Sequence, residues 1–191
     1  MAPEPPSAAN AVFLLVDHQT GVLEWVVKSP PPEQVEANVL RLARAAAILD
    51  IPAILTTNEE RENGPLLAAI EEILPDAVAN RIERHGIIDS FADPAVMEAL
   101  TATGRSQLVT AGIGTDVCGV APALHANRDG YQVIFVADAC ATETAFGHDV
   151  SLRQLEHAGV ELATTASIIS EFAGEYSAEW PQPGSALRLD M

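Results

Sequence analysis

One strand–turn–helix segment of the chain reads Leu108-Val109-Thr110-Ala111-Gly112-Ile113-Gly114-Thr115-Asp116-Val117-Cys118-Gly119-Val120. Its apolar start predicts a strand, its two glycines predict a tight turn, and residues 121–127 have the pattern of a helix. We expect Thr115 to be the N-cap of this helix, which places Cys118 in the first helical turn. Free N–H groups and the positive end of the helix dipole lower the pKa of a thiol at such a position, and the thiolate is the reactive form.

Two observations keep the role of Cys118 open at this point. Asp116 is a carboxylate two residues away and opposes the formation of a thiolate, so a nucleophilic Cys118 requires a further cation nearby. A lone cysteine is also commonly a buried structural residue. Position alone therefore leaves a nucleophile and a structural thiol as alternatives.

Outward from this segment, predicted strands alternate with predicted helices along the chain. This alternation predicts an α/β fold, in which a mainly parallel sheet is covered by helices on both faces. The expected strands are residues 11–16, 51–56, 80–84, 107–112, 131–137 and 160–164, and the expected helices are 35–49, 66–74, 93–103, 116–128, 148–158 and 167–172. We predict one domain, residues 11–175, between a flexible Pro-rich N-terminal tail, residues 1–10, and a C-terminal tail, residues 176–191.

The composition of the 191-residue chain limits its partners and its location. Apolar residues make up 48%, and the net charge is −17, which argues against binding to nucleic acid or to anionic membranes. The chain has two cysteines, no signal-peptide pattern and no apolar stretch of membrane-spanning length. We therefore expect a cytoplasmic protein that acts on a small molecule.

Candidate site residues follow the predicted strands. Ligands of open α/β sheets bind beyond the carboxyl ends of the strands, where the strand order reverses. In the order 3-2-1-4-5-6, strands 1 and 4 flank that point, so Asp17 and Cys118 meet in one crevice. Asp17, half-buried at a strand end, can accept the thiol proton, and Arg84 can supply the cation. Gln19 can hold Asp17 or a polar group of the substrate.

Each of these residues also has a structural alternative. Asp17 can cap the turn after its strand, Gln19 can be a solvated loop residue, and Arg84 can form a surface salt bridge with Glu83 or Asp89. His85 is the one histidine that offers an alternative base. We expect no metal, because no His-x-His or His-x-x-x-His pair occurs, and no nucleotide cofactor, because the Gly-rich motifs are incomplete.

Several segments form a recognisable set, namely Leu15-Val16-Asp17-His18-Gln19, Arg84 with Ser90-Phe91, the Ala111 to Cys118 segment, and Gly130-Tyr131-Gln132-Val133 before Asp138-Ala139. From residue 11 to about residue 172, the chain resembles the isochorismatase-like cysteine hydrolases. It is most similar to the YcaC-like subgroup, through Thr56-Thr57-Asn58, Asn63-Gly64-Pro65-Leu66 and Arg84-His85-Gly86.

The resemblance implies a Rossmann-like, three-layer α/β/α fold and an Asp/Lys/Cys triad, with Asp17 and Cys118 as its first and third members. Arg84 stands where the family usually has a lysine, and arginine hardly donates a proton. The resemblance further implies a cis peptide at Ile113-Gly114, which would aim the N–H groups of Gly114 and Cys118 at an oxyanion. It also implies a homo-oligomer.

These observations predict a cysteine hydrolase that cleaves an amide-type C–N bond of a small molecule through a thioester. The expected catalytic residues are Asp17, Arg84 and Cys118, and the expected oxyanion or substrate-binding residues are Gly114, Thr115, Gln19 and Asn58. One alternative is an isochorismate-like vinyl-ether hydrolase with Asp17 as general acid. The other is a catalytically weak oligomeric protein that binds a metabolite.

Overall fold

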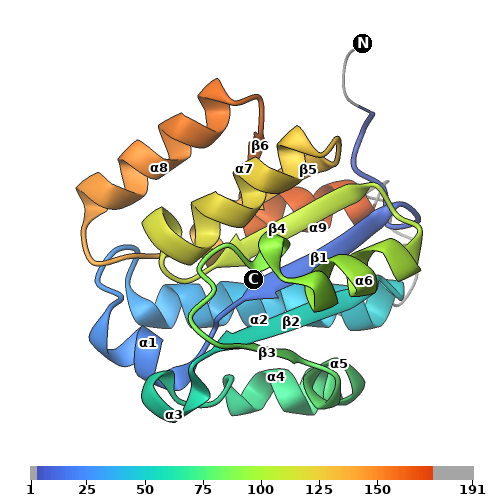
Figure 1. Cartoon of the computed structure of the whole chain (residues 1–191). Coiled ribbons are helices and arrows are strands. Elements are labelled where there is room, and N and C mark those ends of the chain that lie inside the picture. Colours follow the sequence, from blue (N-terminus) through green and yellow to red (C-terminus); the bar gives the residue numbers. More distant parts are fainter. Residues whose placement is uncertain (1–3, 174–191) are drawn as a thin grey trace, which may run out of the picture.

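Within residues 4–173, which the computed structural model describes, six strands form one parallel sheet in the order β3-β2-β1-β4-β5-β6 (Figure 1). The predicted fold class and strand order are therefore confirmed. The strands are β1 (Ala11–Val16), β2 (Ala53–Asn58), β3 (Ile82–Arg84), β4 (Gln107–Gly112), β5 (Gln132–Val136) and β6 (Glu161–Ala163).

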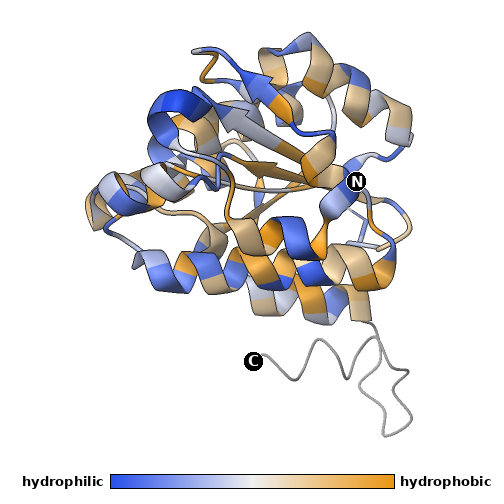
Figure 2. Cartoon of the chain, turned by 90° about the horizontal axis from the view of Figure 1, so that it is seen from below, coloured by the Kyte–Doolittle hydropathy of each residue, from blue (hydrophilic) through white to orange (hydrophobic). Residues whose placement is uncertain are grey.

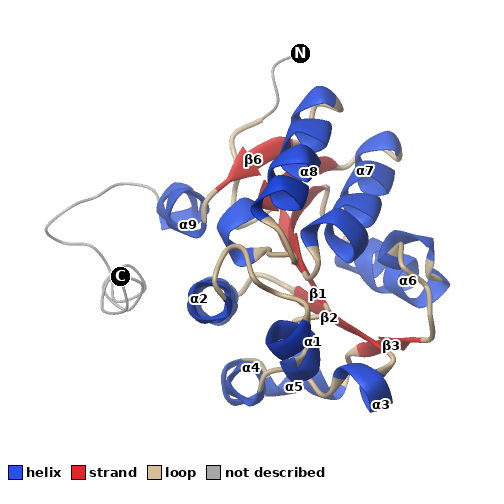
Figure 3. Cartoon of the chain, turned by 90° about the vertical axis from the view of Figure 1, so that its left-hand side faces the viewer, coloured by secondary structure: helices blue, strands red, loops and turns tan. Residues whose placement is uncertain are grey.

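Helices cover both faces of the sheet, as Figure 3 shows with the strands between two helical layers. One side holds α1 (Thr20–Trp25), α2 (Pro32–Leu49), α4 (Ala68–Ile73), α5 (Pro75–Ala79) and α9 (Thr165–Ala173). The other side holds α6 (Pro94–Thr103), α7 (Val120–Arg128) and α8 (Ala145–His157), while the short α3 (Glu60–Asn63) lies beside β3. This is the three-layer arrangement that the resemblance implied.

Burial explains the pattern of the central strands. Every residue of β1 and of β4 is buried, because helices cover both faces of a parallel sheet. The covering helices are amphipathic instead, and Figure 2 shows hydrophilic and hydrophobic residues side by side along them. In α2, for example, Val35, Val39 and Leu42 are buried on the face that contacts the sheet.

Several short helices differ from the sequence-based expectation. The segment that begins at Thr20 forms α1, which we did not predict. Neither α3 nor α5, which begins at Pro75, is among the helices that we expect from the sequence. These helices have six residues or fewer and no side-chain cap, so their sequences carry little helical signal.

Of the predicted N-terminal tail, residues 1–10, the structure describes residues 4–10, and these are hydrogen-bonded to the sheet. The Ser7 backbone N–H donates to Gln107 Oε1 at 2.9 Å, and Gln132 Nε2 donates to the Glu4 carbonyl at 2.7 Å. The predicted C-terminal tail lies outside the described residues. Of the helices in residues 4–173, none combines the length and the apolar character needed to cross a bilayer.

Candidate active site

The carboxyl edge of the sheet brings together residues from separate strands. Asp17 follows β1, Asn58 ends β2, Arg84 ends β3, and Cys118 lies beyond β4 in a π-helical turn, η2 (Thr115–Gly119). Because β1 lies between β2 and β4, these positions meet at the point where the strand order reverses. The structure therefore brings these four predicted residues to one edge of the sheet.

A cavity of about 200 Å³ opens at this edge, and four predicted site residues line it. They are Asp17, Asn58, Gly114 and Cys118. The remaining lining residues are Val22 of α1, Val26 at the end of that helix, Asn63, Ile113, Val117 and Thr142. The sequence did not point to Thr142, which lies beyond β5 and beyond the 3-10 turn η3 (Ala137–Ala139) that follows it.

Asp17 is buried, and both oxygens of its carboxylate accept a hydrogen bond. The residue is 2% exposed, and its backbone has a left-handed φ of 60°, which ends β1 and which aspartate tolerates better than most residues. Thr56 donates its hydroxyl to Asp17 Oδ1 at 3.0 Å, and the Arg84 guanidinium donates to Oδ2. Asp17 is thus a carboxylate held between a hydroxyl and a cation.

Arg84 is a buried cation with two separate hydrogen-bonding arms. It is 1% exposed, so the alternative of a surface salt bridge with Glu83 or Asp89 is wrong. One terminal nitrogen donates to Asp17, and the other donates to the carbonyl of Ile87 and, at 3.2 Å, to that of Ile88. The planar fork of an arginine allows both contacts at once, whereas the single ammonium of a lysine is a point charge.

Gln19 is a buried residue that joins two segments next to the site. It is fully buried, its Oε1 accepts from the Asn58 backbone N–H at 2.9 Å, and its Nε2 donates to the Gly64 carbonyl at 2.5 Å. The alternative of a solvated loop residue is therefore wrong, and the side chain does not line the cavity. Its place in the structure is that of a clamp between β2 and the loop that follows α3.

Asn58 presents its side chain at the cavity wall. Its Oδ1 accepts from the Gly86 backbone N–H at 2.9 Å, which links the end of β2 to the loop that Arg84 holds. No acceptor for the Asn58 side-chain NH₂ group occurs in the described part of the chain, although the cavity lies beside it. Arg84 therefore fixes Asp17 directly and Asn58 through the loop.

The turn that carries Cys118 differs from the predicted helix start. The Gly119 N–H donates to the Gly114 carbonyl at 3.0 Å, five residues back, and the α-helix begins only at Val120. We expected Thr115 to be the N-cap of this helix, but the N-cap of α7 is Gly119. Thr115 is buried, its hydroxyl is 2.9 Å from His148 Nδ1, and it does not line the cavity.

The peptide bond between Ile113 and Gly114 is cis, as the resemblance implied. The backbone N–H of Thr115 donates to the Ala141 carbonyl at 2.8 Å, which ties the turn to the chain beyond β5. No described residue accepts a hydrogen bond from the Gly114 backbone N–H. Gly114 thus brings a free donor to the cavity wall.

The pKa of the Cys118 thiol is raised, and the expected lowering is wrong. Burial, the largest cause, together with the charge of Asp17 raises the pKa of Cys118 to about 12, while Arg84 opposes this shift only in part. The opposing charge is not that of Asp116, which the sequence suggests, because Asp116 is exposed and accepts from the Thr142 hydroxyl. Cys118 is therefore a neutral thiol beside a carboxylate at neutral pH.

The histidines lie away from this chemistry. His85, the alternative base, is exposed and does not line the cavity. His125 contacts Asp89 through its Nδ1 at 2.7 Å, and His18 is buried with Nε2 3.0 Å from the Ala139 carbonyl. Across residues 4–173 no group of three or more potential metal ligands comes together. Within the cavity, Asp17 is the residue that can act as a base for Cys118.

Comparison with known proteins shows which family the chain matches. Residues 11–167 match the model of the Isochorismatase domain. The probable hydrolase YcaC of Escherichia coli (strain K12) is 36% identical over 163 residues, which cover 85% of this chain and 77% of that protein.

Two solved structures are similar over nearly the full length. YcaC from Pseudomonas aeruginosa, determined with hexane-2,5-diol and covalent acrylamide, has a TM-score of 0.91 and 33% identity, covering 98% of this chain and 92% of that one. The YcaC gene product of Escherichia coli, an octameric hydrolase of unknown specificity, has a TM-score of 0.92 and 32% identity, covering 100% and 92%.

Proposed function

The chain belongs to the isochorismatase family and, within it, to the YcaC-like subgroup, and on this premise we propose that it is a cysteine hydrolase of small amides. The observation that carries the proposal is the shared cavity, which is lined by the Cys118 thiol and by the Asp17 carboxylate that Arg84 holds. Its volume of about 200 Å³ is below the range of about 300–1,000 Å³ for drug-sized ligands, so the substrate is small.

The proposed reaction begins from the neutral thiol. Asp17 takes the Cys118 proton as the sulfur attacks the carbonyl carbon of the amide, so no free thiolate is needed beforehand. The N–H groups of Gly114 and Cys118 hold the oxyanion of the tetrahedral intermediate. When the C–N bond breaks, Asp17 returns the proton to the leaving amine, and a thioester remains on Cys118.

Water completes the proposed cycle. Asp17 accepts a proton from the water molecule that attacks the thioester carbonyl, and the collapse of this second intermediate releases a carboxylic acid. The proton returns to the sulfur and restores the thiol. Arg84 balances the charge of Asp17 throughout and does not transfer a proton, because the guanidinium stays charged. Asn58 offers its free NH₂ group to a polar atom of the substrate.

A panel of small primary amides tests this proposal, with ammonia release as the readout. The Cys118→Ala and Asp17→Asn variants are expected to lose turnover, whereas Cys140→Ala, which removes the other cysteine, is expected to retain it. Mass spectrometry of the protein quenched during turnover should show an acyl group on Cys118. Full turnover by the Cys118→Ala variant would sink the proposal.

The two alternatives make different demands on the same residues. A vinyl-ether hydrolase uses Asp17 as its general acid and does not need the Cys118 thiol. Such an enzyme would keep its activity in Cys118→Ala and lose it in Asp17→Asn. A weak metabolite-binding protein would turn over no amide of the panel and would bind a small molecule tightly in both variants.

We further propose that the chain forms a homo-oligomer in the cytoplasm. The relative from Escherichia coli is octameric, and this chain exposes large apolar side chains: Trp25, Val26, Ile87, Ile88, Val117, Phe146 and Val150. Single exposed apolar residues are ordinary, but a set of this kind is typical of a surface that a partner covers. Both cysteines are free thiols, in keeping with a reducing compartment.

A further inference from the structure

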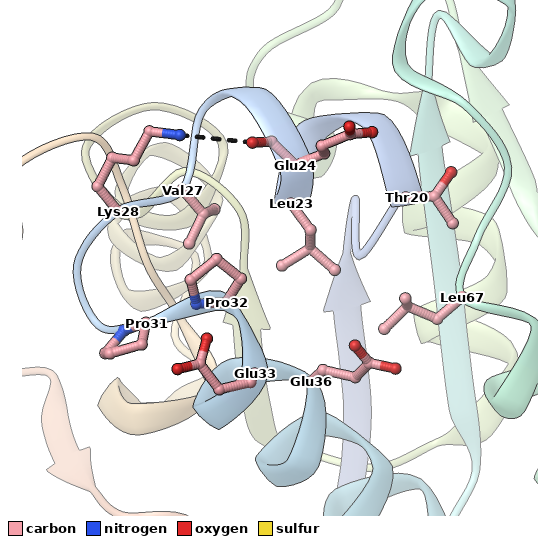
Figure 4. Close-up of a pocket in the computed structure, with 10 residues that line it drawn as sticks. All are labelled: Thr20, Leu23, Glu24, Val27, Lys28, Pro31, Pro32, Glu33, Glu36 and Leu67. Carbon is pink, nitrogen blue, oxygen red and sulfur yellow. Dashed lines mark hydrogen bonds between the residues drawn. The ribbon is translucent and has the colours of Figure 1, made fainter.

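A second and larger cavity lies beside the catalytic one. It is a groove of about 700 Å³ between α1 and the beginning of α2 (Figure 4). None of the proposed catalytic residues lines it. Its lining residues are Thr20, Leu23, Glu24, Val27, Lys28, Pro31, Pro32, Glu33, Glu36 and Leu67.

The groove combines an apolar floor with an acidic rim. Leu23, Val27 and Leu67 project into it in Figure 4, with the ring of Pro32 beside them. Three exposed carboxylates surround this floor, those of Glu24, Glu33 and Glu36. None of them forms an ion pair with another described residue. The groove thus offers an apolar contact surface and unneutralised negative charge in one place.

The positive charges at the groove do not cancel the acidic rim. Lys28 donates its Nζ to the Glu24 backbone carbonyl at 3.4 Å, at the edge of the groove. The N-terminus of α2 adds a partial positive charge of about half a unit, and Glu33 lies in the first turn beside it. Three carboxylates therefore face one ammonium group and one helix end, and the balance stays negative.

Helix α1 separates the groove from the catalytic cavity. Val22 and Val26, one turn apart, line the catalytic cavity, whereas Leu23 and Val27 line the groove. Neighbouring faces of α1 and of the two residues that follow it thus form walls of two different cavities. A molecule in the groove would not touch Cys118, so the two sites can be occupied and tested independently.

We propose that this groove binds an organic cation, namely an ammonium group carried on an apolar body. The apolar body packs on Leu23, Val27 and Leu67, and the ammonium group lies between the carboxylates of Glu33 and Glu36. An anion would meet three like charges at the rim. A neutral apolar molecule would gain the floor but no partner for the carboxylates, so charge selects the ammonium.

Isothermal titration calorimetry with 2-phenylethylammonium tests the proposal on the full chain in its native assembly. The neutral isostere 2-phenylethanol is expected to bind at least about fivefold more weakly. Binding of the ammonium should weaken by about fivefold in the Glu33→Gln/Glu36→Gln variant, which loses two exposed charge partners. The matched control, Glu98→Gln/Glu156→Gln, removes two exposed carboxylates from α6 and α8 in the other helical layer and should bind like the parent.

Alkylation of Cys118 with iodoacetamide separates the groove from the catalytic cavity. Binding that persists after alkylation supports the groove, and binding that disappears places the ammonium beside Cys118 and overturns the proposal. Equal affinity for the ammonium and the alcohol overturns it as well. So does an equal loss of affinity in both double variants, which would indicate a general attraction to the acidic chain.

Discussion

Cys118 shows how burial changes the chemistry that position alone suggests. The beginning of a helix stabilises a thiolate, but the thiol lies largely inside a small cavity and faces Asp17. Loss of water and the nearby negative charge raise its pKa to about 12, and the single cation Arg84 does not compensate. The nucleophile is therefore formed by proton transfer to Asp17 when the substrate is bound, and is not present in the resting protein.

The first prediction separates thiol reactivity from catalysis in one variant. Asp17→Asn removes the negative charge that raises the pKa of Cys118, so alkylation by iodoacetamide at pH 8 should become faster, by about tenfold if the pKa falls by one unit. Amide turnover should be lost in the same variant, because the base is gone. In the parent, the alkylation rate should rise about tenfold per pH unit from pH 7 to pH 10, below the pKa of about 12.

Asp116→Asn is the matched control for this charge effect. Asp116 is two residues from Cys118 in the sequence, but its carboxylate accepts from Thr142 and the shift of the thiol arises from burial and from Asp17. Alkylation of this control should follow the parent at every pH. An alkylation rate in Asp17→Asn that is equal to or below that of the parent would contradict the assigned electrostatics.

The second prediction concerns the two arms of Arg84. Arg84→Lys retains a positive charge for Asp17 but loses the second arm, which holds the carbonyls of Ile87 and Ile88. The free energy of unfolding should fall by about 1–2 kcal/mol, because buried hydrogen bonds to a charged group are lost. Hydrogen exchange of residues 85–89 should accelerate, while Cys118 alkylation changes little.

Arg81→Lys provides the comparison for this variant. Arg81 also lies at β3, but its ion pair with Glu60 is partly exposed, so the same substitution should cost less than about 1 kcal/mol. It should leave exchange in residues 85–89 unchanged. If Arg84→Lys also leaves that exchange unchanged, the second arm does not hold the loop.

At the scale of the elements, the site is built from strand ends and from the short segments that connect them. Gln19 joins two of these segments, since it accepts from Asn58 and donates to the Gly64 carbonyl while being fully buried. The Gly86 N–H then holds the Asn58 side chain. The cavity wall therefore depends on residues that do not themselves face it.

The third prediction tests this clamp. Gln19→Met keeps a similar volume but leaves the Asn58 N–H and the Gly64 carbonyl without their partner, so the free energy of unfolding should fall by about 2 kcal/mol. Chemical denaturation provides the measurement. Gln34→Met on the exposed side of α2 is the control and should stay within about 0.5 kcal/mol of the parent. Equal stability of the two variants would mean that Gln19 is not a clamp.

The elements also show what the sequence can predict and where it stops. An apolar run such as residues 11–16 indicates a buried strand by composition, and the alternation of strands with helices indicates a parallel sheet covered on both faces. The short helix α1 has no such signal, yet it supplies Val22 to the cavity, and its C-cap residue, Val26, also lines the cavity. It contacts α3, a segment distant in the sequence.

The residues of the site could likewise be predicted from the sequence only in part. Asp17, Arg84 and Cys118 could be assigned to one edge because each follows a strand, and the contact of Arg84 with Asp17 agrees with that prediction. The part played by Gln19 and the partner of Thr115 could not be predicted, since both depend on segments distant in the sequence. The direction of the Cys118 pKa shift depends on burial, which a linear pattern does not contain.

At the scale of the whole molecule, two surface properties act against each other. A net charge of −17 makes copies of the chain repel one another at low ionic strength. Exposed apolar side chains favour association instead, and Phe146 at the start of α8 is the most exposed of them, at 76%. Salt screens the repulsion and leaves the apolar contacts in place, so assembly should strengthen as ionic strength rises.

The fourth prediction follows from this balance. Multi-angle light scattering at low micromolar protein should show an oligomer in 0.5 M salt, and Phe146→Ser should shift it to a smaller species, because burying a phenylalanine contributes about 2 kcal/mol at each contact. Gln154→Ser, an exposed position on the same helix, should leave the mass unchanged. A monomeric parent at 0.5 M salt would contradict the proposed oligomer, whereas an unchanged mass in Phe146→Ser would move the interface away from the start of α8.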